Sequence, residues 1–269
     1  MSAEMGHHDS AAAYKITLNG NDCTPWWATL FEDPVFQGFW DRIIPPSHTA
    51  AEMAFVQKAL SVAPPGRLLD ALCGTGRHLL GLAALGYDVT GIDRATYPLR
   101  SIRERAARDG LKITLVQADV RDSHFEEEFD GACCLGASFG YYDDSDNEAF
   151  LRNIAVALKS GARFVLDAPI VAETALTRFT GRQWLPIGDQ HLLIQYRYDS
   201  AESRLFEEMT IVQAGSQHRR TASYRIYLYR EIVSMLQRAG FTAIVAYGGM
   251  DFRSYKLGDN ECIIVACKD

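Results

Sequence analysis

Residues 68–78, LLDALCGTGRH, decide the fold of this chain. An apolar start leads into an acidic residue, Asp70, and then into a short loop that contains Gly74 and Gly76. A helical pattern of apolar residues begins directly after this loop. A strand, a glycine-rich turn and a helix in this order open a doubly wound sheet that binds nucleotides. Glycine lacks a Cβ, so the backbone can approach a ligand closely, and the new helix presents unpaired N–H groups to it.

The spacing of the two glycines separates this loop from two other phosphate-binding loops. A dinucleotide fingerprint requires a third glycine three positions after Gly76, where this chain has Leu79. A P-loop requires Lys and then Ser or Thr after its last glycine, where this chain has Arg77 and His78. The plain alternative is a glycine-rich turn in some other α/β protein.

The loop resembles the first motif of class I S-adenosylmethionine (SAM) dependent methyltransferases, acid-x-G-x-G-x-G. Asp70 takes the acid position, and Gly74 and Gly76 take the second and third glycine positions. Leu72 replaces the first glycine, which is a departure from the motif. The resemblance implies that SAM is the cofactor and that it contacts the loop residues Asp70, Ala71, Leu72, Cys73, Gly74 and Gly76.

Composition limits the class of protein. A chain of 269 residues holds one large α/β domain or two small ones, and 48% hydrophobic residues supply a core. The net charge of −7 argues against a nonspecific nucleic-acid binder, although RNA stays open as a methyl acceptor. No apolar run reaches the roughly 18 residues of a membrane span, and the start of the chain lacks a secretory pattern. Six cysteines without metal-ligand spacing indicate a reduced, cytoplasmic protein with no metal site.

Strand and helix patterns alternate over the middle of the chain. Strands are predicted at 67–72, 88–93, 112–117, 130–136 and 162–168, with helices at 76–85, 98–109 and 146–159 between them. Near-continuous apolar strands separated by helices predict a parallel sheet covered on both faces. A helix at 230–239 and strands at 241–247 and 261–267 complete a Rossmann-like sheet of seven strands, whose final hairpin is antiparallel.

Ligands of such sheets bind where the strands end. Asp93 ends the second strand, where a carboxylate accepts hydrogen bonds from both ribose hydroxyls of a nucleoside; dinucleotide enzymes use the same device. The resemblance implies that the residues after the third strand receive adenine and that those after the fourth contact the methionine part and the acceptor. For each acid alone, a solvated loop carboxylate is the plain alternative, but acids at three successive strand ends favour a site. The predicted cofactor residues at these ends are Asp93, Arg94, Asp119, Val120, Leu135 and Gly136.

Two further segments frame the predicted core. Residues 24–43 are dense in aromatic side chains at helical spacing, and they predict either a flap packed on the core or a cap over the active site. Three extended runs, at 191–198, 204–212 and 221–229, predict an antiparallel meander inserted over residues 181–228, which lines the acceptor pocket or forms a dimer surface. The predicted organisation is a tail and helical cap (1–62, of which 1–12 are expected to be mobile), a SAM-binding core (63–180), the insertion (181–228) and a C-terminal helix and hairpin that complete the core (229–269).

The resemblance extends over most of the chain. The segments GRHLLGLAALGYDVTGID, ADVRD, SFGYYDD and REIVSMLQRAGF are similar to a bacterial group of class I methyltransferases that carries SFGYF after the fourth strand. This group includes N-methyltransferases of amino sugars and other natural-product tailoring enzymes, which implies methyl transfer to nitrogen or oxygen of a small-molecule acceptor. An NAD-type oxidoreductase and a SAM-binding protein without turnover are the alternatives.

Candidate polar groups beside the acceptor are Ser138, Tyr141, Tyr142 and His191. Tyr141 is expected to shape the acceptor site, and no residue is assigned as a general base. Each candidate has a plain alternative, because tyrosines often form pocket walls and a histidine in a strand can simply face solvent. A homodimer formed through the meander is the alternative role of that segment.

Overall fold

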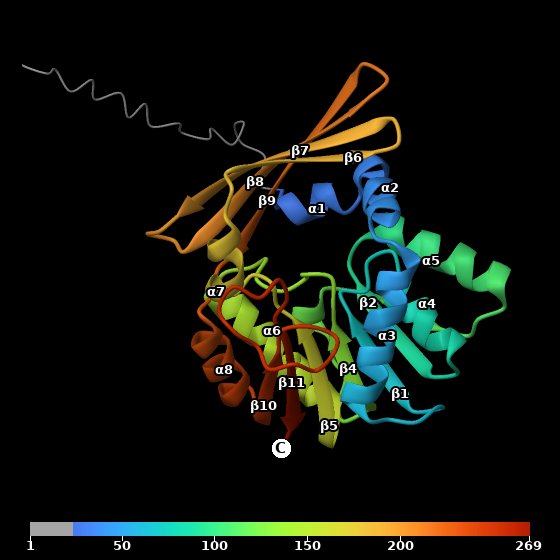
Figure 1. Cartoon of the computed structure of the whole chain (residues 1–269). Helices are drawn as coiled ribbons and strands as arrows, with labels where there is room; N and C mark the ends of the chain where they lie inside the picture. Colours follow the sequence, from blue (N-terminus) through green and yellow to red (C-terminus); the bar gives the residue numbers. More distant parts are fainter. Residues whose placement is uncertain (1–23) are drawn as a thin grey trace, which may run out of the picture.

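A seven-stranded sheet forms the centre of the computed structural model, which describes residues 24–269 (Figure 1). The sequence expectation for residues 1–12 lies outside this range. The strand order is β10-β11-β5-β4-β1-β2-β3, in which β11 is antiparallel to both of its neighbours, β10 and β5, and all other neighbouring strands pair in parallel. The strands are β1 (Arg67–Ala71), β2 (Asp88–Asp93), β3 (Thr114–Gln117), β4 (Phe129–Cys134), β5 (Leu158–Asp167), β10 (Phe241–Tyr247) and β11 (Ile263–Lys268). The predicted fold class and the antiparallel final hairpin are therefore confirmed.

Helices cover both faces of this sheet, because alternate strand residues point to opposite sides. Leu68 faces the core formed with α3 (Pro46–Leu60), α4 (Arg77–Ala84) and α5 (Thr96–Asp109). Leu69 faces the other core, formed with α6 (Asp144–Ala157) and α8 (Tyr229–Arg238). Short helical turns complete the connections: η1 (Val120–Asp122), α7 (Ala172–Ala175) and η2 (Leu176–Arg178).

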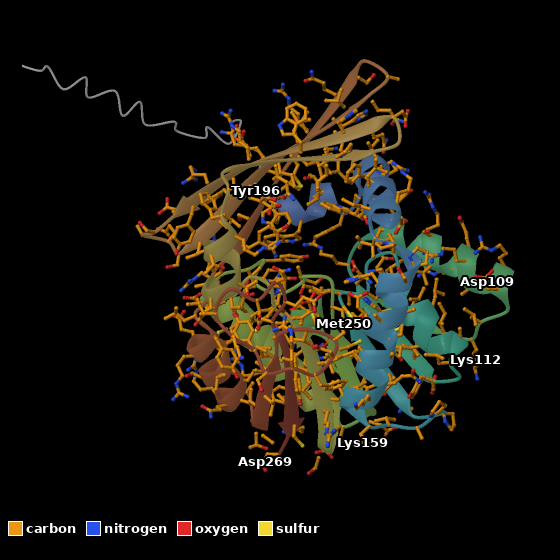
Figure 2. All side chains as sticks on the ribbon, in the orientation of Figure 1. Asp109, Lys112, Lys159, Tyr196, Met250 and Asp269 are labelled. Carbon is orange, nitrogen blue, oxygen red and sulfur yellow. The ribbon has the colours of Figure 1, made fainter. Side chains whose placement is uncertain are left out.

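A second, four-stranded antiparallel sheet lies over the edge at which the parallel strands end (Figure 1). Its inner face packs on the N-terminal helices, so that cap and meander share one small core that includes Phe36, Phe39, Leu192 and Ile211. In Figure 2, Tyr196 marks this meander, whereas Lys159 and Asp269 mark the opposite edge of the core. The elements are α1 (Trp26–Leu30), α2 (Pro34–Ile43), β6 (Arg182–Ile187), β7 (Gln190–Asp199), β8 (Arg204–Gln213) and β9 (Ser216–Arg225).

Several predicted boundaries are wrong for local physical reasons. The first strand ends before Leu72, because that residue adopts a left-handed φ of +58°. Helix α6 begins at Asp144, two residues before the predicted start at 146, because the Asp143 carboxylate accepts from the Asp146 N–H. Strand β5 begins at Leu158, four residues before the predicted start at 162, so Gly161 lies inside the strand. Strand β6 was not predicted, since its Pro186 interrupts the pattern, but an edge strand tolerates proline.

None of the helices between residues 24 and 269 is long and apolar enough to cross a membrane.

Candidate active site

The glycine loop after β1 is built from alternating left-handed residues. Leu72, Gly74 and Gly76 have φ values of +58°, +51° and +78°. A Cβ on Gly76 would lie 2.6 Å from Ile102, so close packing against α5 requires glycine there. A Cβ on Gly74 would meet nothing within 4 Å, so this glycine leaves open space beside the loop. Leu72 supplies the turn that the motif's first glycine would supply, at a cost of roughly 1 kcal/mol of backbone strain.

Asp93 closes the loop from the end of β2. Its Oδ2 accepts from the Gly74 N–H and its Oδ1 accepts from the Ala95 N–H, each at 2.9 Å. Burial raises the pKa of Asp93, and these backbone hydrogen bonds oppose the rise. The carboxylate keeps lone pairs that can accept hydroxyl groups of a ligand.

Asp70 lies beneath the same loop and is 1% exposed. Its only polar contact among the described residues is the Cys133 thiol, 3.8 Å from Oδ1, and its Oδ2 has no hydrogen-bond partner there. Burial raises the pKa of Asp70 to about 6. Ala71 and Cys73 are buried in the two cores, so these two residues can reach a ligand only through their backbone.

Asp119 is not a free acceptor, because Arg121 already holds it. The Arg121 guanidinium donates to both carboxylate oxygens, at 2.9 and 2.8 Å, and lies 4.0 Å from the ring centroid of Tyr142. These contacts lower the pKa of Asp119 even though burial opposes them. Val120 is fully buried, so its side chain belongs to the core. Sequence reasoning did not anticipate Arg121, although the ADVRD spacing places it two residues after the acid.

One pocket brings many of the predicted residues together. Its lining combines the glycine loop, the end of β2, the loop after β4 and the cap: Trp27, Phe31, Gln37, Leu72, Gly74, Asp93, Arg94, Pro98, Ser138, Tyr141 and Tyr142. The ring of Trp27 stands edge-on to Tyr142 at 5.3 Å, and Trp26 contacts Tyr141 at 5.1 Å. Burial raises the pKa of both tyrosines, so their phenols stay protonated near neutral pH and cannot serve as bases there.

His191 is the sequence candidate that does not join this group. It is exposed on β7, where it pairs with Pro186 and Val212, while its neighbours Gln190 and Leu192 are buried. Its side chain therefore faces away from the cap, and its position does not support a role beside the acceptor.

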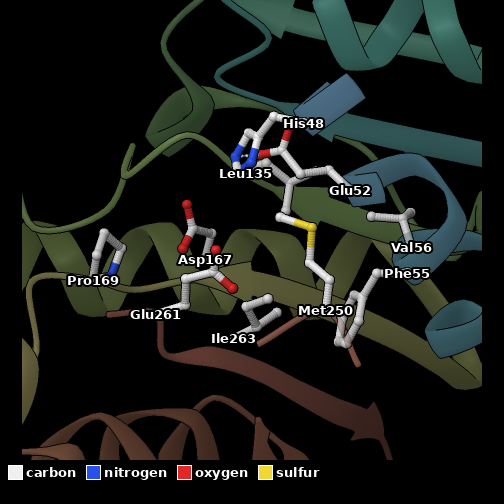
Figure 3. Close-up of a pocket in the computed structure, with 10 residues that line it drawn as sticks. All are labelled: His48, Glu52, Phe55, Val56, Leu135, Asp167, Pro169, Met250, Glu261 and Ile263. Atoms are coloured by element: carbon white, nitrogen blue, oxygen red, sulfur yellow. Dashed lines mark ion pairs between the residues drawn. The ribbon is translucent and has the colours of Figure 1, made fainter. Parts of the chain in front are cut away.

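A second cavity, of about 200 Å³, lies at the ends of β4 and β5 (Figure 3). Of the predicted residues, Leu135 lines it; Gly136 follows, and a Cβ there would lie 3.7 Å from the Arg77 guanidinium. The other lining residues were not predicted, although Asp167 ends the fifth strand just as Asp93 ends the second. They are His48, Glu52, Phe55, Val56, Asp167, Pro169, Met250, Glu261 and Ile263.

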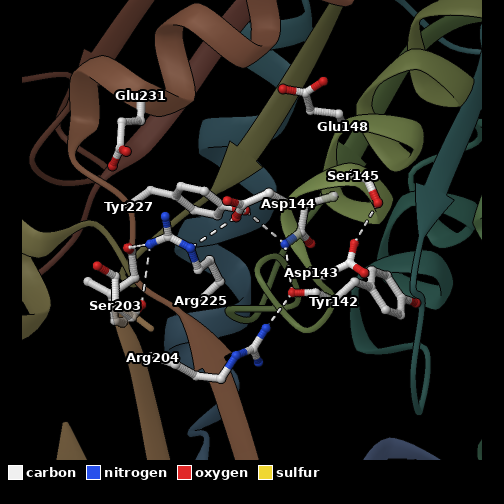
Figure 4. A network of polar contacts seen from close by, with 12 residues as sticks. Tyr142, Asp143, Asp144, Ser145, Glu148, Ser203, Arg204, Arg225, Tyr227 and Glu231 are labelled. Atoms are coloured by element: carbon white, nitrogen blue, oxygen red, sulfur yellow. Dashed lines mark hydrogen bonds and ion pairs between the residues drawn. The ribbon is translucent and has the colours of Figure 1, made fainter. Parts of the chain in front are cut away.

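The meander is anchored to the loop that carries the two tyrosines (Figure 4). Arg204 donates to the Tyr142 carbonyl at 2.6 Å, and Arg225 donates to Asp144 at 2.9 Å. The backbone N–H of Arg225 also donates to the Gly140 carbonyl at 2.7 Å. Because these contacts join β8 and β9 to the loop after β4, the meander and the tyrosine loop are held as one unit.

Comparisons with known proteins agree with this geometry. Residues 68–161 match a family described as a methyltransferase domain. Glycine/sarcosine N-methyltransferase from Aphanothece halophytica is 31% identical over 144 residues, which are 51% of this chain and 54% of that protein. The chain spans about half the length of the curated relatives it matches first.

Solved structures share the fold over nearly the whole chain. The CcbJ methyltransferase from Streptomyces caelestis has a TM-score of 0.76 at 19% identity, covering 90% of this chain and 99% of its own. A SAM-bound amino pentose methyltransferase from Micromonospora echinaspora has a TM-score of 0.68 at 19% identity, covering 88% of this chain and 98% of its own.

Residues 68–161 therefore match a methyltransferase domain, and SAM is the cofactor that this match and the fold shared with a SAM-bound structure indicate. The site fits this group, which carries cationic ammonium and sulfonium centres. The open space beside Gly74 is a cradle that a side chain would fill, and the Asp93 carboxylate at the end of β2 lines the same pocket. The match to a methyltransferase domain favours SAM over the NAD-type alternative.

Proposed function

We propose that this protein transfers a methyl group from SAM to a nitrogen of a small molecule. Gly74, Asp93 and Arg94 would hold the nucleoside side of the cofactor, and Leu135 and Gly136 would face its methionine part. Bound SAM supplies a methyl group on a sulfonium, which is a good leaving group. The task of the protein is to hold the acceptor nitrogen in line and to exclude water, which is worth roughly 7–11 kcal/mol in favourable cases.

The observation that carries this proposal is the roof over the strand ends. Trp27 from the cap and Tyr142 from the anchored loop meet edge-on above the glycine loop. Arg204 and Arg225 fix that loop to the meander. The space beneath this roof is enclosed, and the cavity at the ends of β4 and β5 is small, which favours a small-molecule acceptor over a folded protein or RNA.

Nitrogen is favoured over oxygen by two kinds of support. The related proteins named above act, by their names, on glycine and sarcosine nitrogen or on an amino pentose. In this chain the cavity at the ends of β4 and β5 is lined by the carboxylates of Asp167 and Glu261, which attract a cationic amine more strongly than a neutral hydroxyl group. An amine exposes its lone pair once it has lost a proton, whereas a hydroxyl needs a base during the reaction.

Titration calorimetry and an assay of S-adenosylhomocysteine release test the proposal. We expect binding of SAM and S-adenosylhomocysteine, no binding of NAD, and turnover with members of a panel of small amines. Phenols, carboxylates and transfer RNA complete the panel. Turnover confined to RNA or protein would contradict the small-molecule acceptor, and SAM binding with no turnover on any class would favour a binding protein.

A further inference from the structure

The cavity at the ends of β4 and β5 carries a charge pattern that bears on the substrate of the proposed function. Two carboxylates, Asp167 and Glu261, point into it and toward one another (Figure 3). Asp167 ends β5, and its Oδ2 accepts from the Ala137 N–H at 3.1 Å. Glu261 precedes β11 and makes no hydrogen bond or ion pair with any residue from 24 to 269.

No cation among the described residues forms an ion pair with Asp167 or Glu261; Arg253, whose charge interacts with Glu261, is paired with Asp259 at 2.6 Å. The lining of the cavity contains no lysine or arginine among the described residues, and its single basic side chain is His48. The nearby Arg77 is committed to Glu52, to which it donates from both terminal nitrogens, with Nη2–Oε1 at 2.9 Å. Burial, and then the charges of Glu52 and Glu261, raise the pKa of Asp167 to about 6. Enclosed carboxylates that repel one another are stabilised by a cation and disfavour a further anion.

The remaining walls are apolar and fit the rest of a small amine. Phe55, Met250 and Ile263 line the side facing α3 and β11. The cavity, of about 200 Å³, has room for a small molecule. Pro169 also lines a wider groove of about 720 Å³ beside Tyr196 and Trp184, so a larger acceptor can extend toward the meander.

We infer that this cavity is the acceptor site and that Asp167 and Glu261 select small amines that carry no carboxylate. The inference rests on the proposed function and names its substrate class. An ammonium group donates to the two carboxylates, while its alkyl or ring part lies against Met250 and Phe55. Because an ammonium nitrogen has no lone pair, one of the two carboxylates would take a proton from it before the nitrogen accepts a methyl group. A carboxylated amine such as glycine or sarcosine brings a negative charge into a space already lined by acids, so the acceptor differs from those named for the curated relatives.

The test uses the whole chain saturated with S-adenosylhomocysteine. Calorimetry measures binding of 2-aminoethanol and glucosamine against glycine and sarcosine, and the same four compounds are assayed for turnover with SAM. Glu261→Gln and Asp167→Asn remove one charge each with little change of shape. Glu208→Gln, on the exposed face of β8, is the matched control.

We expect the plain amines to bind at least tenfold more tightly than glycine. Glu261→Gln should weaken amine binding about tenfold or more, leave S-adenosylhomocysteine affinity within twofold, and Glu208→Gln should change neither. Preference for glycine, or unchanged amine binding in both acid variants, would overturn the inference and leave the methyltransferase standing. Loss of S-adenosylhomocysteine affinity in Glu261→Gln would also overturn it, because the cavity would then hold the methionine part. Failure of the parent protein to bind S-adenosylhomocysteine would instead contradict the proposed function.

Discussion

The backbone N–H of Gly74 donates to Oδ2 of Asp93 at 2.9 Å, so the loop after β1 is tied directly to the end of β2. The other oxygen of the same carboxylate holds the Ala95 N–H at the start of α5. The Asp93 side chain therefore holds the loop after β1 and the residue that precedes α5. It also keeps lone pairs that can accept hydrogen bonds from a ligand. A change at Asp93 should act on the cofactor in two ways, by removing a direct acceptor and by loosening the loop.

Asp93→Ala is predicted to weaken SAM binding. Hydrogen bonds to a charged group contribute about 1.5–3 kcal/mol each, which corresponds to roughly 10- to 150-fold in affinity for one bond. Asp93→Asn should lie between parent and alanine, since its amide keeps one acceptor oxygen. Calorimetry with SAM measures the affinities, and circular dichroism checks that each variant is folded. Parent-like affinity in a folded Asp93→Ala protein would remove this residue from the site.

Gly74→Val is predicted to weaken SAM binding strongly and to lower the stability of the fold only slightly. A Cβ at Gly74 meets only open space within 4 Å, so the new side chain enters the ligand cradle and not the core. Gly110→Val is the matched control, because Gly110 has a similar φ of +66°, the same open surroundings and a place at the far end of α5. Thermal melting should show comparable backbone strain in both variants. Equal SAM affinities in the two variants would show that the cradle lies elsewhere.

The adenine assignment predicts that Asp119→Asn lowers SAM affinity moderately without unfolding the protein. The carboxylate is held by Arg121, and an amide would lose half of that pairing and present a donor to the adenine amino group. Analogues with adenine and with hypoxanthine distinguish the roles, because the latter lacks the amino group. The variant should lose the parent's preference for adenine. If that preference is retained in full, the carboxylate does not contact the base.

The sequence predicts a residue of this site only where a regular strand or helix pattern fixes the position of that residue. Asp93 was predictable, because parallel strands end at one edge and its strand pattern is unambiguous. Glu261 was not, because it follows an irregular segment and reaches the cavity only through the pairing of β11 with β5. His191 was misplaced for another reason, since a strand's alternation gives two faces without saying which one packs on the cap. The pairing of Arg121 with Asp119 could not be predicted, because the spacing of the two residues does not determine where their side chains point.

The meander is predicted to serve the acceptor side through its inner face. Tyr196 lies on this face and lines the wide groove next to Leu205, whereas Arg197 lies on the outer face, paired with Asp199 at 3.2 Å. Tyr196→Ala should alter the KM for the acceptor and leave SAM affinity near the parent value, and Arg197→Ala should change neither. Sedimentation of both variants tests the alternative. A drop in molecular mass for either one would favour a dimer surface.

Glu52 is predicted to give the fold a pH dependence in the acid range. It is 7% exposed, and it lies 2.9 Å from the Arg77 guanidinium and 3.1 Å from Nε2 of His78. Burial alone would raise its pKa, but the contacts with His78 and Arg77 prevail and lower it from 4.5 to about 2. Because the folded pKa lies below the unfolded one, this stabilisation is fully present above about pH 4.5 and is lost as the pH falls toward 2.

Glu52→Gln should therefore lower the free energy of unfolding at pH 7 by about 3 kcal/mol, and the loss should shrink between about pH 4.5 and 2. Urea unfolding at pH 7, 4 and 3 measures the difference from the parent at each pH. Glu208→Gln again serves as the control, because that carboxylate is exposed and its loss should leave the parent curve unchanged. A constant difference between Glu52→Gln and the parent at all three pH values would mean that the pair with Arg77 and His78 does not set the charge state of Glu52.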